Sequence, residues 1–349
     1  MNDRQLESQK NKEDLIREAE DAIGREDPED YLIQPTLFPK KLVSSAPELA
    51  AILEHSSLTE TAKRYEEQDA QALNTQELFK RLSKRSTWAV FVATTAAAVL
   101  ASLTAISPEE PGFLFRALFV LLGLCSLAGG SLAAFVLYRI NSEHLLRSWM
   151  SSRAAAESER LGYFYRTVRR ITEKNANHPR LYLLCLEFIR RYQLAVQQNY
   201  YRDRGASHRH SRRRTVITGA VAAAILALGA GGFGIWASVS PIVLPLSALG
   251  TIGAALTIVA SRREELNQDE RNAERYQRTY ETLSSIRELH SDVQQVVASG
   301  HSEVLVQYVD AIHEQLSLEH RQWLAETEAM DSTIRELNSS LRTLIREGN

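Results

Sequence analysis

The sequence predicts an all-α membrane protein with four transmembrane helices, arranged as two tandem helical hairpins with long cytosolic amphipathic or coiled-coil helices. Four windows predict the spans, because each runs for 19 to 26 residues without Asp, Glu, Lys, Arg or His: Trp88–Ile106, Ala117–Tyr138, Thr215–Ser240 and Pro241–Ser261. A helix needs roughly 20 apolar residues to cross a bilayer core about 30 Å thick. The rest of the chain is very polar, since the mean hydropathy of the whole is only −0.25.

The spans divide the chain into four parts. Residues 1–62 form an acidic N-terminal cytosolic segment with a proline-containing loop, and residues 301–349 form a C-terminal cytosolic amphipathic helix. Between them lie two units of two spans each: residues 63–176, with spans near 87–106 and 114–139, and residues 177–300, with spans near 215–238 and 242–261. No basic n-region with a short apolar stretch opens the chain, so we expect the spans to direct insertion.

Basic residues predict which span ends face the cytoplasm, where Lys and Arg are enriched. Basic clusters precede the first and third spans and follow the second and fourth, whereas the hairpin turns carry only acids or no charge. Both termini and the central segment are therefore expected in the cytoplasm. A collar of basic residues would contact anionic lipid headgroups at about 1 kcal/mol per residue, and we expect no nucleic-acid partner: Lys84, Arg85, Arg209, Arg212, Arg213 and Arg214.

Two features of the cytosolic segments concern assembly and metal binding. Met330, Ile334, Leu337, Leu341 and Leu344 step 4-3-4-3, the spacing of a coiled-coil seam. This seam would pack either on its own chain or against another subunit. His208 and His210 stand in a segment of net charge +5 and lack a third ligand, so we interpret them as solvated rather than metal-binding.

The two hairpins resemble copies of one unit. Arg64-Tyr65 and Arg191-Tyr192 each precede a pair of spans, at an offset of 127 residues. After the spans the offset is 117 residues, which a hairpin shorter by about ten residues explains. The helices that follow carry matching charges, which form either a solvated face with i, i+4 ion pairs or a contact between repeats or subunits: Arg153, Glu157 and Arg160 in the first copy, and Arg271, Glu274 and Arg278 in the second.

Small residues within the spans predict close helix packing. Residues 229–234 match the dinucleotide fingerprint G-x-G-x-x-G, but that motif joins a strand to an amphipathic helix, and none follows here. In a span, glycines instead let two helices approach closely. The same reasoning applies to three pairs spaced by four residues: Ala97 with Ala101, Gly219 with Ala223, and Gly250 with Ala254.

Arg116 is the charge nearest to a span interior, four residues after Gly112. It would either anchor the span by reaching the outer interface or, in an oligomer, form a ring at the mouth of a pore that favours anions or slows cations. No Ser-His-Asp, paired-carboxylate or P-loop arrangement stands out. We therefore expect no enzyme, no catalytic residue, no cofactor and no metal site.

A helix with Arg-Tyr, two spans joined by a tight turn, and a following helix with Arg-x-x-Ala-Glu together resemble the SLATT superfamily of two-span bacterial proteins. The matching residues are Arg64, Tyr65, Arg153, Ala156, Glu157 and Arg160, then Arg191, Tyr192, Arg271, Ala273, Glu274 and Arg278. The second copy departs from the pattern, with two residues between Arg271 and Glu274. The resemblance implies a pore-forming or membrane-perturbing effector of a nucleotide-signalled or antiphage conflict system, in the bacterial inner membrane, whose sensor or nucleotide-signalling partner is encoded separately.

Two functions are therefore expected as alternatives. The first is a membrane effector that forms a pore or channel as a homo-oligomer, a dimer or higher, because four helices in one chain leave little room for hydrated ions. The second is a non-conducting scaffold that anchors cytosolic coiled-coil helices for partner assembly.

Overall fold

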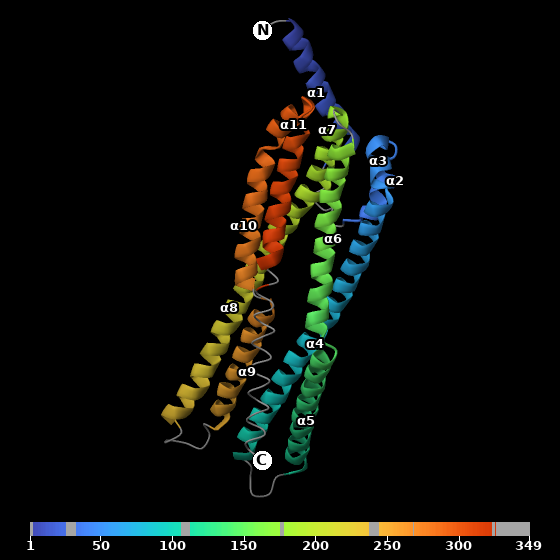
Figure 1. The fold of residues 1–349 in the computed structure, drawn as a ribbon. Helices are drawn as coiled ribbons and strands as arrows, with labels where there is room; N and C mark the ends of the chain where they lie inside the picture. The colour runs from blue at the N-terminus through green and yellow to red at the C-terminus, as the bar shows by residue number, and fades with distance from the viewer. Residues whose placement is uncertain are drawn as a thin grey trace. The chain divides into compact units, whose positions relative to one another are not determined.

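The protein is described from a computed structural model, which describes residues 3–25, 33–105, 112–174, 178–236, 244–267, 269–322 and 325. Every regular element in these residues is helical (Figure 1), so the all-α prediction is confirmed. The helices are α1 (Asp3–Ile23), η1 (Pro35–Leu37), α2 (Phe38–Leu42), α3 (Pro47–Leu53), α4 (Ser56–Ala105), α5 (Phe113–Ser142), α6 (Leu145–Lys174), α7 (Pro179–Ile189), η2 (Arg190–Ala195), α8 (Val196–Trp236), α9 (Leu244–Asn267), α10 (Asp269–Glu288) and α11 (His290–Ala298). Residues 302–322 are also helical.

The chain forms two compact units, and each is described by itself. Unit 1 comprises Met1–Ala72, Met150–Arg204 and Arg275–Asn349, and unit 2 comprises Leu73–Trp149 and Gly205–Glu274. Each unit gathers segments that are distant in the sequence, whereas the four parts defined from the sequence follow chain order. The boundaries of those parts stay predictions.

Helix α7 is the central helix of unit 1. Its residues 181–189, Leu-Tyr-Leu-Leu-Cys-Leu-Glu-Phe-Ile, are all buried. A helix that is apolar on all sides belongs inside a protein core. Pro179 suits the start of this helix, because proline lacks the N–H that would have no partner in a first turn. The chain then continues through η2, a π-helical turn, into α8.

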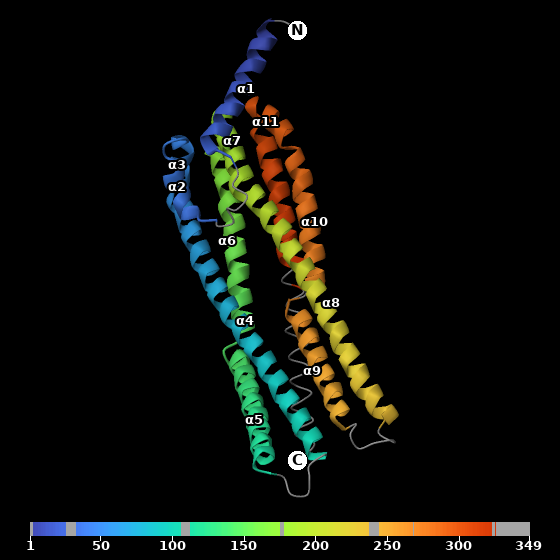
Figure 2. The ribbon, with the colours of Figure 1, turned by 180° about the vertical axis from the view of Figure 1, so that it is seen from behind.

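The N-terminal region packs on this core. Phe38 of α2 is fully buried, with its ring centroid 5.3 Å from that of Phe188 and 4.6 Å from that of Tyr192. Helix α1 lies beside α7 and α11 in both views (Figures 1 and 2) and buries Ile16, Ala19 and Ile23. The proline-containing segment therefore contributes short helices and core side chains to unit 1.

Unit 2 contains two pairs of long helices, packed at small residues. A Cβ atom built on Gly129 of α5 would lie 2.9 Å from the carbonyl oxygen of Ala89 on α4. In the other pair, a Cβ on Gly229 of α8 would collide with the backbone of Gly250 on α9. These approaches leave no space for larger side chains, as expected for membrane helices that pack through glycine. Gly229 lies inside α8, and the packing interpretation of Gly250 is confirmed.

Two helical stretches, Ser56–Thr104 and Phe113–Glu173, contain windows long and apolar enough to cross a membrane. Only 22% and 11% of the residues in these windows are buried, so neither resembles the core helix of a soluble protein. They match the first two predicted spans. A shorter apolar helix, Ala248–Ser261, coincides with part of the fourth. The four-span arrangement stays a prediction, because the third and fourth windows include residues outside the described ranges.

Other expectations fall outside the described residues or find no contact within the chain. The 330–344 seam, the 107–111 and 239–241 turns, and residues 176 and 177, where the two predicted two-span units meet, lie outside the described residues. Ala97 and Ala101 are exposed, and nothing lies within 4 Å of a Cβ built on Gly219. These two small-residue pairs therefore face away from their hairpin partners.

Candidate functional site

Unit 1 contains a partly buried cluster of charged residues, called here the arginine–glutamate cluster. It is assembled from α4, α6, α8, α10 and the helix 302–322: Asp69, Arg153, Glu157, Arg160, Tyr201, Arg275 and Glu319. Charged groups are rarely buried unless they are paired. The cluster is therefore the first place to look for a role beyond packing.

Glu157 is the centre of the cluster. Its carboxylate lies 2.5 Å from Nη2 of Arg153, and it accepts a hydrogen bond of 2.7 Å from Nε of Arg160. The three residues occupy one face of α6, because i, i+3 and i+4 positions on a helix are neighbours. Burial alone would raise the pKa of Glu157, but the two guanidinium groups overcome this effect and lower it to about 2. The carboxylate is held ionised.

Two further carboxylates extend the cluster to other helices. Asp69 accepts a hydrogen bond of 3.0 Å from Nη1 of Arg153. Glu319 accepts one of 3.0 Å from the hydroxyl of Tyr201 and pairs with Nε of Arg275 at 3.4 Å. Burial raises the pKa of both carboxyl groups, and the charge of Glu157 adds to the rise. The arginines oppose these shifts, so the cluster balances ion pairing against desolvation.

One donor of the cluster has no acceptor. Arg160 is only 3% exposed, and its Nη1 has no hydrogen-bond partner among the residues described by the structure. The neighbouring Ala156 is fully buried and brings α6 close to the core. A buried ion pair or network contributes less to stability than its contacts suggest, because each charge loses its hydration.

The structure brings together one predicted set of charges and separates the other. Arg153, Glu157 and Arg160 form one ion-paired network in which Arg160 is buried and the other two are partly exposed, and it contains the predicted i, i+4 pair of Arg153 with Glu157. Arg271, Glu274 and Arg278 are exposed on α10. Their contact with another subunit, and that of the first set, stays a prediction.

In α10 the buried charged residue next to the predicted Glu274 is Arg275, and Asp269 at the start of the helix is buried as well. Sequence reasoning did not single out Asp69, Arg275 or Glu319 as site residues. A signal for Asp69 existed, because it follows the buried Tyr65 by one helical turn.

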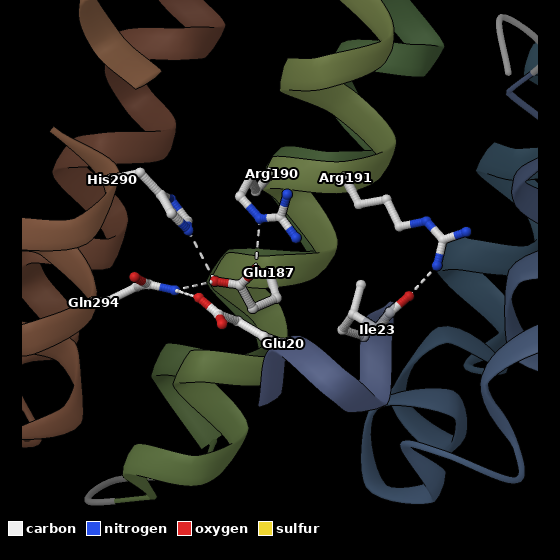
Figure 3. Close-up of polar contacts among 7 residues, drawn as sticks. All are labelled: Glu20, Ile23, Glu187, Arg190, Arg191, His290 and Gln294. Atoms are coloured by element: carbon white, nitrogen blue, oxygen red, sulfur yellow. Dashed lines mark hydrogen bonds and ion pairs between the residues drawn. The ribbon is translucent and has the colours of Figure 1, made fainter. Parts of the chain in front are cut away.

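A second polar cluster surrounds Glu187 on α7, which has 0% exposure (Figure 3). Its carboxylate contacts Nε2 of His290 at 2.8 Å, and it accepts hydrogen bonds from Gln294 at 2.7 Å and from Arg190 at 2.6 Å. Burial would raise the pKa of Glu187, but these partners lower it. The apolar run of α7 with a single carboxylate was the signal that the sequence offered for this site.

The same cluster holds α1 in place. The amide nitrogen of Gln294 also donates a hydrogen bond of 2.8 Å to Glu20. Arg191 donates to the carbonyl oxygen of Ile23, at the C-terminus of α1, where a cation is favourable. Figure 3 shows that the adjacent Arg190 and Arg191 of η2 point to these different partners. The chain leaves α1 through Gly24, whose φ of +79° suits glycine.

The predicted collar of basic residues is exposed, and one of its members forms an ion pair with α10. All six predicted collar residues are exposed. Arg212 pairs with Glu270 at 2.6 Å. His208 contacts the buried carboxylate of Asp269 at 2.7 Å, so the prediction that His208 is solvated is wrong. This long-range pair joins α8 to the first turn of α10.

Arg116 lies exposed in the first turn of α5, and its role at a pore mouth stays a prediction.

The chemistry available at these clusters is electrostatic. Within the residues that the structure describes, no group of three or more His, Cys, Asp and Glu side chains is placed to hold a metal ion. Both described cysteines are free, and burial raises the pKa of the Cys185 thiol.

No protein-family model, no curated protein and no solved structure matches this chain.

Proposed function

We propose that this protein is a four-span bacterial membrane effector that forms a pore by association of its hairpins. Unit 2 would lie in the bilayer and unit 1 in the cytoplasm. The resemblance of its motifs to the SLATT superfamily favours a role in a nucleotide-signalled or antiphage conflict system, with a separately encoded sensor.

One observation carries the membrane part of this proposal: unit 2 exposes many large apolar side chains, and its helix pairs meet at small residues. Its exposed residues include Phe113, Leu114, Leu127, Phe135, Val216 and Leu228. Soluble proteins rarely expose contiguous apolar patches of more than a few hundred Å². Lipid tails are the solvent that suits such helices.

Association between copies is supported by two small-residue pairs that none of the described helices covers. Ala97 and Ala101 are exposed on α4, and Gly219 with Ala223 lie open on α8. Small residues four apart let membrane helices from separate chains approach closely. The tight contact of Gly229 with Gly250 also argues that an ion path does not run between the helices of that hairpin.

The second candidate function is a non-conducting scaffold. It is favoured by the outer faces of unit 2, which are aliphatic and aromatic and therefore suit lipid better than water. The 330–344 seam would then bind the partner coiled coil.

Topology is tested by cysteine labelling in a chain whose Cys125 and Cys185 are replaced. Cysteines at Glu109 and Ser240 should react with an impermeant thiol reagent from outside intact cells, whereas cysteines at Ser151 and Ser207 should not. Labelling at Ser207 in intact cells would overturn the two-hairpin topology.

Conduction is tested with purified protein in liposomes, together with its oligomeric state in detergent. An oligomer that passes small ions would support the effector, and Arg116→Glu should then shift the preference between cations and anions. A strictly monomeric protein without flux would leave the scaffold as the better proposal.

A further inference from the structure

We propose that the outer face of α4 binds one anionic phospholipid. Lys84 and Arg85 contact the headgroup phosphate, Trp88 lies at the boundary between headgroup and acyl chain, and Val92 lies beside the chain. This inference rests on the proposed embedding of unit 2 in a bilayer. It narrows the predicted collar of six basic residues to the two on α4 and adds an aromatic anchor to them.

Helical geometry places these side chains on one strip of α4. Each residue turns an α-helix by about 100°. Trp88 therefore lies between Lys84 and Arg85 in angle and one turn further along, at the first residue of the charge-free window. Val92 follows Trp88 after one more turn of the same strip. The buried residues of this part of α4 lie about 140–200° around the helix from Lys84 and mark the opposite face: Leu82, Ser86 and Ala89.

The exposed fractions agree with this arrangement. Trp88 is 53% exposed and Val92 is 46% exposed, and both basic side chains are exposed as well. The ring of Trp88 packs edge-on against Phe91, with centroids 5.6 Å apart, so this neighbour restricts the indole. Tryptophan is enriched where a membrane meets water, because it combines an apolar ring with an N–H donor.

The acidic residues nearest in sequence are paired with other arginines. Glu77 is the last acid of α4, and it forms an ion pair with Arg81. Glu143, just after α5, pairs with an arginine of that helix. Within the part of the chain that the structure describes, no ion pair joins Lys84 or Arg85 to an acid. An anionic headgroup would supply the missing counter-charge.

The order of charge and apolar surface favours a lipid over a soluble anion. Two cations followed by an aromatic ring and an aliphatic side chain match a phosphate followed by an acyl chain, whereas a soluble phosphate would use only the cations. The other hairpin provides a matched comparison. Arg213 and Arg214 stand just before its first predicted span, but the chain has no Phe, Trp or Tyr between Tyr201 and Phe233.

The test measures lipid contact at Trp88 by fluorescence quenching in vesicles. The full-length protein carries phenylalanine in place of the other three tryptophans, so that only Trp88 reports: Trp149→Phe, Trp236→Phe and Trp323→Phe. The vesicles contain equal amounts of phosphatidylglycerol and phosphatidylcholine, and one of the two lipids has brominated acyl chains, which quench tryptophan on contact. Brominated phosphatidylglycerol should quench Trp88 more strongly than brominated phosphatidylcholine does.

Two double variants locate the preference. Lys84→Ala with Arg85→Ala should remove it, a change of up to about 30-fold in relative affinity when each residue contributes as basic residues do near anionic membranes. The matched control, Arg213→Ala with Arg214→Ala, removes two adjacent exposed charges from α8 and should leave the preference at Trp88 unchanged. An equal loss in the control would reveal a general effect of basic charge and overturn the site on α4.

The remaining outcomes separate the possible failures. Absence of quenching by either lipid would place α4 outside the bilayer and contradict the proposed function. Equal quenching by both lipids would support embedding and overturn the lipid site alone. Soluble glycerophosphate should leave the preference intact. Its loss at an equal concentration of glycerophosphate would assign Lys84 and Arg85 to a free phosphate and overturn the lipid proposal.

Discussion

The two units of this chain differ in the side chains that they bury. Unit 1 buries its largest side chains, including Tyr163, Tyr182, Phe38 and Phe188, and keeps most of its charges at the surface. In unit 2, the described buried apolar residues are alanines, apart from a small cluster of Phe79, Leu82, Val136 and Leu145. Many of its other Leu, Val and Phe side chains are exposed.

This difference is what the proposed placement of the two units in different solvents, water and lipid, would require. In water, burial of apolar area stabilises a fold, so large side chains belong inside. In lipid that driving force between helices is absent, and close contact through small residues takes its place. Substitutions that remove a charge partner should therefore damage unit 1 most, and substitutions that add volume should damage unit 2 most.

The largest expected effect is the loss of Glu157. Glu157→Ala leaves Arg160 buried without its partner and should destabilise unit 1 by about 3–5 kcal/mol. The control is Glu159→Ala on the same helix, whose partner Arg64 is 43% exposed, and it should cost at most about 1 kcal/mol. The free energy of unfolding of both variants is measured by thiol labelling of the buried Cys185 at increasing urea concentration, in a Cys125→Ser background. Equal losses would show that the cluster has no special role.

Low pH should also lower the free energy of unfolding of unit 1, because it protonates Glu157. The folded pKa of about 2 lies below the ordinary value of 4.5, so this carboxylate contributes stability above pH 4.5 that is lost as the pH falls toward 2. The contribution is on the order of 3 kcal/mol. Thermal melts followed by circular dichroism at several pH values in this window should show a steep fall for the wild type. A Glu157→Gln variant with the same slope would contradict this assignment.

Added volume should destabilise the hairpins of unit 2. Gly229→Ala places a methyl group against the backbone of Gly250 and should cost about 1–3 kcal/mol. Gly219→Ala on the same helix meets nothing within 4 Å and should be neutral. Thermal unfolding in detergent compares the two variants. If Gly219→Ala proves the more damaging, that glycine contacts another subunit, and the oligomer should then dissociate.

The smallest effect concerns α1. Gly24→Ala strains a residue with φ of +79° and would place a Cβ 2.9 Å from Nη1 of Arg191. It should cost about 1 kcal/mol and loosen α1 while the rest of unit 1 stays folded. Faster hydrogen exchange confined to residues 9–23 would confirm this. Exchange that rises equally in α7 would mean that α1 is an inseparable part of the core.

The sequence predicted what depends on local spacing. Charge-free windows indicated membrane helices, and the i, i+4 spacing of Arg153 and Glu157 indicated an ion pair that the structure contains. The contacts of Glu319 with Tyr201 and of His208 with Asp269 join residues 118 and 61 positions apart. Only tertiary packing places such pairs together, so spacing alone predicted neither. The repeat comparison pointed to Glu274 because it matched types of residue, whereas burial selects Arg275 one position later.

The π-helical turn Arg190–Ala195 has a consequence for the angular phase of the long helix that follows it. An α-helix turns by about 100° per residue, so one additional residue would rotate everything downstream by that amount. A π turn closes its hydrogen bonds from i to i+5 and absorbs an additional residue locally. Within unit 1, buried residues lie on both sides of this turn, through Ile189 of α7 and from Val196 to Gln198 of α8. An insertion or deletion of one residue in this segment would therefore have to be absorbed at the π turn for the buried residues of α7 and of the first turn of α8 to keep their positions.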